Sequence, residues 1–250
     1  MLREVVISVF GLFHPTELDI APADHRLLEV TCGSTRKQLE GKARKLSLKV
    51  GCHVSGTFTL SVPGRIERTF TGHLRVEPGL TALLTLDLES AVAATVAAEL
   101  PSTTPAAALE AQAIAVRSYF ASLPAGRHAY RAFCDTTHCQ HIRGAIASDH
   151  PAARATKATQ GLVLQYQSKI LTAMYSAACT GSRQAGVANA DGYVYAAVPC
   201  NYCQRHPGNT KRLAHRKGLC QAGAADLART GKTAEEILRH YYPGTRVTSL

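Results

Sequence analysis

Short runs of alternating apolar and polar residues, punctuated by glycine and proline, fill the first 86 residues of the chain. This pattern is typical of β-strands, whose side chains point to opposite faces at every second residue. The runs expected as strands are VVISVF, ELDI, RLLEVTC, KLSLKV, GTFTLSV, RTFTGHLRV and TALLTLDL. The basic residues between Arg36 and Lys49 are interpreted as a solvated face. Residues 1–86 are therefore predicted to form a β-rich support domain.

The pattern becomes helical after residue 87. Residues 89–100 (ESAVAATVAAEL) are rich in alanine, which has the highest helix propensity. A second helix is expected over 106–122, with Thr104 as its N-cap and Pro105 in its first turn. Apolar residues at three- and four-residue steps predict one buried face for this helix. That face consists of Leu109, Ala113, Val116 and Phe120.

The last third of the chain mixes both kinds of element. A helix near 152–159 precedes two β-like runs, LVLQYQ and ILTAMYSAAC. Another helix is expected over 222–229, and Thr233-x-x-Glu236 is a capping box that opens the final one. Strands and helices follow no regular βαβ alternation, which favours an α+β fold. Residues 87–250 are predicted to form the second domain, which carries the candidate catalytic residues.

Composition narrows the class of protein. Hydrophobic residues make up 46% of the chain and charged residues 18%, which is typical of a globular protein and excludes intrinsic disorder. No stretch approaches the roughly 20 apolar residues of a membrane span. The net charge of +10 indicates an anionic partner, with nucleic acid, anionic lipid and the bacterial cell wall as candidates.

Cysteine usage is unusual, with eight cysteines in 250 residues. Cys32 and Cys52 lie in the strand-rich part and are interpreted as buried thiols. The other six fall between residues 134 and 220, several beside histidines, which favours metal ligation or disulfides. No secretory signal is recognised, because Glu4 interrupts the apolar start and no cleavable pattern follows. We expect either a chain that stays inside the cell or one whose leader has been removed.

Five sequence blocks follow one another over about residues 86–250. They read LESAVAATVAAELP, ALEAQAIAVRSYF, CDTTHCQHIRG, TQGLVLQYQSKILTAMYSAACTG and GLCQAGAADLARTGKTAEEILRHYYPGT. In their content and order, these blocks resemble the SpoIID/LytB family of bacterial cell-wall proteins. The resemblance implies lytic transglycosylase activity on peptidoglycan glycan strands, or a non-catalytic wall-binding role that enhances a partner amidase. It also implies a location in the cell envelope and no organic cofactor.

A lytic transglycosylase needs one carboxylic acid. The acid protonates the leaving oxygen and then, as a carboxylate, helps the muramyl C6 hydroxyl attack C1. Glu99 fits this role, because its apolar neighbours favour the neutral acid. The resemblance also aligns Glu99 with the family's catalytic position. Glu110, eleven residues later, is the alternative acid.

The CDTTHCQ run carries candidate metal ligands. Cys134 and His138 stand four residues apart, so a thiolate and an imidazole can meet at one Zn²⁺ ion. Cys139 is a further candidate ligand. The resemblance places this block at the active-site cleft, where Asp135 and Gln140 are expected to bind sugar hydroxyls. The alternatives are a loop without metal and a Cys134–Cys139 disulfide.

A second group of candidate ligands follows at Cys200 and Cys203, which form a CxxC pair. With Cys220, and with His206 and His215 between them, the pair predicts a structural zinc site in a loop-rich region. A Cys200–Cys203 disulfide or free thiols are the alternatives.

The closing block departs from the family pattern. His215 and Gln221 align with it and are expected to contact substrate, but Cys220 replaces the usual Ser. Cys179 likewise stands where the family has small Ser or Gly residues.

Basic residues near the second group also suggest nucleic-acid binding. The chain has no tryptophan for base stacking, so no nucleic-acid partner is expected. The basic residues are Arg205, Lys211, Arg212, Arg216 and Lys217.

Overall fold

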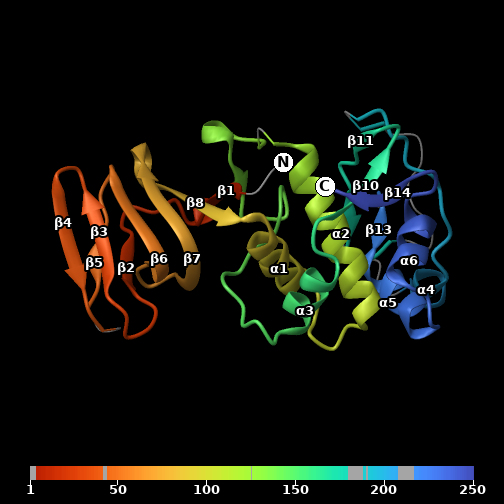
Figure 1. The fold of residues 1–250 in the computed structure, drawn as a ribbon, viewed down its shortest axis with the longest axis horizontal. Helices are drawn as coiled ribbons and strands as arrows, with labels where there is room; N and C mark the ends of the chain where they lie inside the picture. The colour runs from red at the N-terminus through yellow and green to blue at the C-terminus, as the bar shows by residue number, and fades with distance from the viewer. Residues whose placement is uncertain (1–3, 42–43, 125, 180–187, 190, 208–216) are drawn as a thin grey trace. The chain divides into compact units, whose positions relative to one another are not determined.

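The structure is a computed structural model that divides into two compact units, each containing chain from both sides of residue 124 (Figure 1). The strand-rich unit contains residues 2–94 and 125–145, and the helical unit contains residues 95–124 and 146–250. Strands and helices occur without βαβ alternation, which confirms the predicted α+β class. The described residues are 4–41, 44–124, 126–179, 188–189, 191–207 and 217–250.

The strand-rich unit is built on one mostly antiparallel sheet of nine strands. Its main path runs β4-β3-β6-β7-β8-β1-β9, and β2 pairs with both β5 and β6. Figure 1 shows β6 and β7 as neighbouring long strands. The strands are β1 (Glu4–Val9), β2 (Asp19–Pro22), β3 (Leu28–Cys32), β4 (Thr35–Leu39), β5 (Leu46–Ser47), β6 (Cys52–Val62), β7 (Ile66–Glu77), β8 (Thr81–Asp87) and β9 (Phe133–Cys134).

Each of the predicted runs contains a strand, and the sequence prediction missed β4. The first four residues of β4 are exposed, and β4 lies at the edge of the sheet. The polar composition that suggested a solvated face is therefore typical of an edge strand. The unit's core is aromatic and aliphatic, with Phe70 in ring contact with both Phe10 and Phe58.

Residues 125–145 fold with the N-terminal strands, because β9 pairs in parallel with β1. The compact units are thus not divided at the predicted boundary of residue 86. The change of unit falls within α1 (Leu88–Glu99), between Ala94 and Thr95.

Cys32 and Cys52 form a disulfide, so their interpretation as free buried thiols was wrong. The two cysteines are register partners on the adjacent strands β3 and β6. Their separation of 20 residues in the sequence concealed this pairing.

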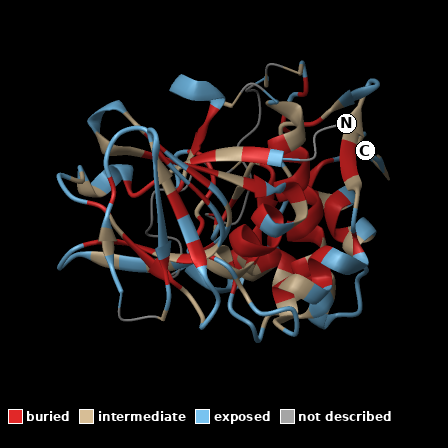
Figure 2. Ribbon diagram, turned by 60° about the vertical axis from the view of Figure 1, so that its left-hand side comes forward, coloured by how far each residue is buried: buried red, intermediate tan, exposed pale blue. Residues whose placement is uncertain are grey.

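The helical unit surrounds helix α2 with smaller elements, and its interior is largely buried (Figure 2). Two small sheets, β11-β10-β14 and β12-β13, belong to it. Its helices are α2 (Ala106–Ser122), α3 (Pro151–Ala158), α4 (Asn201–Arg205), α5 (Gln221–Arg229) and α6 (Ala234–Tyr241). Its strands are β10 (Leu162–Tyr166), β11 (Lys169–Ile170), β12 (Tyr175–Ser176), β13 (Leu219–Cys220) and β14 (Arg246–Ser249).

Helix α2 is buried on every side rather than on one face, since all residues from Ala111 to Phe120 are buried. Arg117 is accommodated there because its guanidinium donates to the carbonyl oxygens of Leu162 (3.0 Å) and Thr156 (3.3 Å). The predicted N-cap was wrong, because Pro105 occupies that position and no side chain caps the helix.

The capping box of α6 is confirmed. The Thr233 hydroxyl accepts from the Glu236 backbone N–H, and the Glu236 carboxylate accepts from the Thr233 N–H. Among the described residues, no helix is both long and apolar enough to cross a membrane.

Candidate functional site

Glu99 and Gln221 meet in the helical unit although 122 residues separate them. Glu99 is the last residue of α1 and is half-buried, and Gln221 is the first residue of α5 and only 4% exposed. The Gln221 side-chain Nε2 donates a hydrogen bond of 3.1 Å to Glu99 Oε2. The predicted catalytic acid and one predicted substrate-binding residue are thus direct partners.

This hydrogen bond links the end of α1 to the start of α5. The amide nitrogen of Gln221 can only donate, so Glu99 Oε2 accepts. Gln221 thus directs its amide N–H at the predicted acid.

Glu110, the alternative acid, lines a different feature of the same unit. It borders an open pocket of about 310 Å³ together with residues of α3, including Arg154. Burial raises the pKa of the Glu110 carboxyl. Glu99 does not line this pocket.

Asp135 is built into the strand-rich unit. Its side chain is buried, and Oδ2 accepts from the Phe10 backbone N–H at 3.1 Å and from Arg68 Nη1 at 3.0 Å. Burial raises the pKa of Asp135, although the Phe10 hydrogen bond and the Arg68 charge act in the opposite direction. These contacts give Asp135 an anchoring role for the turn after β9. Gln140, also predicted to bind sugar, is 2% exposed.

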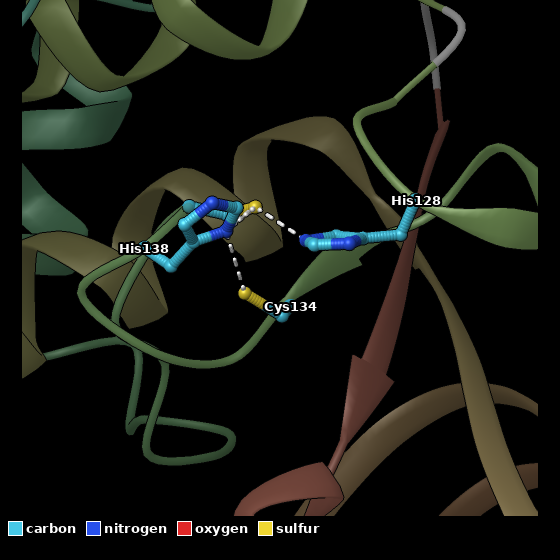
Figure 3. A group of neighbouring side chains, drawn as sticks. His128, Cys134 and His138 are labelled. Carbon is cyan, nitrogen blue, oxygen red and sulfur yellow. Dashed lines mark hydrogen bonds between the residues drawn. The ribbon is translucent and has the colours of Figure 1, made fainter.

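Four candidate metal ligands gather beside that turn (Figure 3). The ligand atoms of His128, Cys134, His138 and Cys139 all lie within 4.8 Å of one another. His128 Nε2 is 3.2 Å from Cys139 Sγ, and His138 Nδ1 is 3.7 Å from Cys134 Sγ. The structure thus brings the three predicted ligands together and adds His128, which sequence reasoning missed. The cysteines are free, not disulfide-bonded.

The turn holds these ligands through its own backbone. The Cys139 N–H donates to the Thr136 carbonyl, and Arg127 Nη1 donates to the His138 carbonyl. Burial lowers the pKa of His128 and raises that of Cys139 to about 11. Two sulfurs and two imidazole nitrogens are a donor set that suits tetrahedral Zn²⁺.

A second group lies in the helical unit and contains the predicted ligands Cys200, Cys203 and Cys220. Its fourth member is Cys179, and all four sulfurs lie within 4.8 Å of one another. His206, which the sequence suggested for this site, is exposed and stacks on Tyr202 instead. His215 lies outside the described residues.

Residues 77–166 match the family model described as SpoIID, Stage II sporulation protein. This region of the chain is similar to the SpoIID family. The match supports a sporulation-related function associated with the cell wall. No curated protein sequence matches the chain.

The SpoIID region contains both candidate acids and the four ligands beside the β9 turn. Gln221 and the four-cysteine group lie outside the matched residues. The partner of Glu99 is therefore supplied by a part of the chain that the family match does not cover.

Proposed function

We propose that this protein is a peptidoglycan lytic transglycosylase, with Glu99 as its single acid and base. The observation that carries the proposal is the Gln221–Glu99 hydrogen bond, which orients a half-buried carboxyl group in the SpoIID region. Glycan strands of the bacterial wall are the substrate.

The reaction requires one proton to move to the leaving group and one to return. Glu99 donates its proton to the glycosidic oxygen as the MurNAc–GlcNAc bond breaks. The resulting carboxylate accepts the proton of the muramyl C6 hydroxyl, whose oxygen bonds to C1. The products are a 1,6-anhydromuramyl end and a free GlcNAc end, and Glu99 is again protonated. No water is consumed, unlike in the hydrolases that use two carboxylates.

The four ligands beside the β9 turn would hold Zn²⁺ in this proposal. All four coordination positions would come from protein side chains, which is typical of structural rather than catalytic zinc. The ion would then stabilise the turn that follows β9.

The charge of +10 suits a protein that works on an anionic wall. Electrostatic attraction would hold the protein on the wall without requiring a particular glycan structure. This argument supports a location in the cell envelope. Enhancement of a partner amidase is the second function that the family resemblance implies, and it requires the fold but no Glu99 chemistry.

The test is digestion of purified glycan strands, both stem-peptide-bearing and stripped, followed by mass spectrometry. The wild-type protein should produce 1,6-anhydromuramyl ends, and Glu99→Gln should abolish them. Glu235→Gln, an exposed carboxylate on α6, is the matched control and should remain active.

The same assay distinguishes between Glu99 and Glu110 as the catalytic acid. If Glu99→Gln remains active and Glu110→Gln does not, the acid is Glu110. If folded, zinc-supplemented wild-type protein yields no anhydro ends from either substrate, the transglycosylase proposal fails. Increased product release by an added amidase would then favour the wall-binding alternative.

A further inference from the structure

Four cysteines converge in the core of the helical unit. They are Cys179, Cys200, Cys203 and Cys220, each at most 2% exposed and none in a disulfide. They come from separate parts of the chain: the segment after β12, the start of α4, α4 itself and the end of β13. Scattered core thiols would not require the sulfurs to face one another.

The distances between the sulfurs match a single tetrahedral ion. All four lie within 4.8 Å of one another, and Cys203 Sγ is 3.7 Å from Cys220 Sγ. Two thiolates at about 2.3 Å from one tetrahedral zinc are about 3.8 Å apart. A disulfide requires sulfurs at about 2.0 Å.

Backbone N–H groups point at the sulfurs. The Cys179 N–H lies 3.5 Å from Cys203 Sγ, the Cys203 N–H donates to Cys200, and the Gly223 N–H donates to Cys220. Such donors around metal-bound thiolates stabilise their negative charge and fix their orientation.

Gly223, in the first turn of α5, packs so closely against the four cysteines that a larger residue would not fit at its position. A Cβ on Gly223 would lie 2.6 Å from Cys200 Sγ and would collide with Tyr241 Oη. The first turn of α5 therefore lies directly against the sulfur group.

We propose that these four cysteines bind a structural Zn²⁺ ion as four thiolates and thereby fix the start of α5. Binding releases the remaining thiol protons to solvent, without any redox change. Because Cys220 is a ligand and the N-cap of α5, the ion also holds the next residue, Gln221, against Glu99. The zinc site stands independently of the proposed reaction.

The experiment isolates this site from the ligands beside the β9 turn. The full chain carrying Cys134→Ser and Cys139→Ser is purified without chelator, and its metal content is measured. We expect one zinc per chain, and none when Cys203→Ser is added. Cys32→Ser with Cys52→Ser, which removes two cysteines from the strand-rich unit, should leave that zinc in place.

A second measurement leaves all four cysteines of this site unchanged. X-ray absorption of the zinc in the Cys134→Ser/Cys139→Ser protein should show four sulfurs at about 2.3 Å and no imidazole scattering. The proposal is overturned by a folded protein without zinc, by iron in its place, or by a mass 2 Da lower that reveals a disulfide among the four. Metal content is measured without substrate, so its outcome is separate from that of the glycan assay.

Discussion

The side-chain amide of Gln221 lies 3.1 Å from a carboxylate oxygen of Glu99, so the first residue of α5 orients the last residue of α1. Gln221→Ala should therefore lower the rate of anhydro-end formation about 10- to 100-fold, the scale expected when a reacting group is misplaced. Its kcat should fall more than its KM rises. An unchanged rate in a folded variant would show that Gln221 does not position the acid.

Asp135→Asn should lower the free energy of unfolding by about 3 kcal/mol. Asparagine can still accept from the Phe10 N–H, but the Arg68 guanidinium, 17% exposed, loses its counter-charge. Urea unfolding measures the loss. Asp135→Asn combined with Arg68→Met leaves no unpaired charge and should recover part of the stability; no recovery would assign the loss to packing.

Glu110→Gln should stabilise the protein at pH 7 more than at pH 4. Burial raises the pKa of Glu110 above 4.5, so the folded state binds the proton more tightly than the unfolded chain. Stability is therefore full below the unfolded pKa and declines as pH rises through the folded pKa. Glutamine removes this decline. Thermal unfolding at both pH values measures the difference, and an equal effect at pH 4 and pH 7 would contradict it.

Gly223→Ala should destabilise the helical unit by about 1–3 kcal/mol, since the new methyl group would collide with Cys200 and Tyr241. Removing the Tyr241 hydroxyl in Gly223→Ala/Tyr241→Phe should recover part of the loss. A double-mutant cycle from chemical unfolding measures this coupling. Strictly additive effects would mean that the hydroxyl is not the obstacle.

His128→Ala should remove zinc from the site beside the β9 turn. In a Cys203→Ser background, which leaves only that site, zinc content should fall from one to near zero, because the imidazole supplies one of four ligands. His73→Ala, an exposed histidine on β7, is the matched control and should retain the metal. Equal zinc in both variants would remove His128 from the ligand set.

Local patterns predicted most elements of the fold. The capping box of α6 and the bounds of α2 are encoded within a few residues, so they could be read directly. The edge strand β4 was missed because its exposed side chains carry no apolar alternation. The short pairing of β9 with β1 was equally invisible, because it joins segments about 125 residues apart.

The candidate metal ligands also fall into those that local sequence predicts and those that only the fold brings together. Cys134 and His138 are neighbours in sequence, so their spacing alone predicted a shared ligand role. His128 could not be assigned to its group, because only the folded chain brings it close to Cys134, His138 and Cys139. Its position six residues before Cys134 was the available signal.

The Cys32–Cys52 disulfide gives the chain two opposed requirements. One pair of sulfurs must be oxidised, whereas six others remain reduced in the same molecule. The two proposed zinc ions would satisfy both, because coordinated thiolates would be protected from oxidation while the pair on β3 and β6 forms its disulfide.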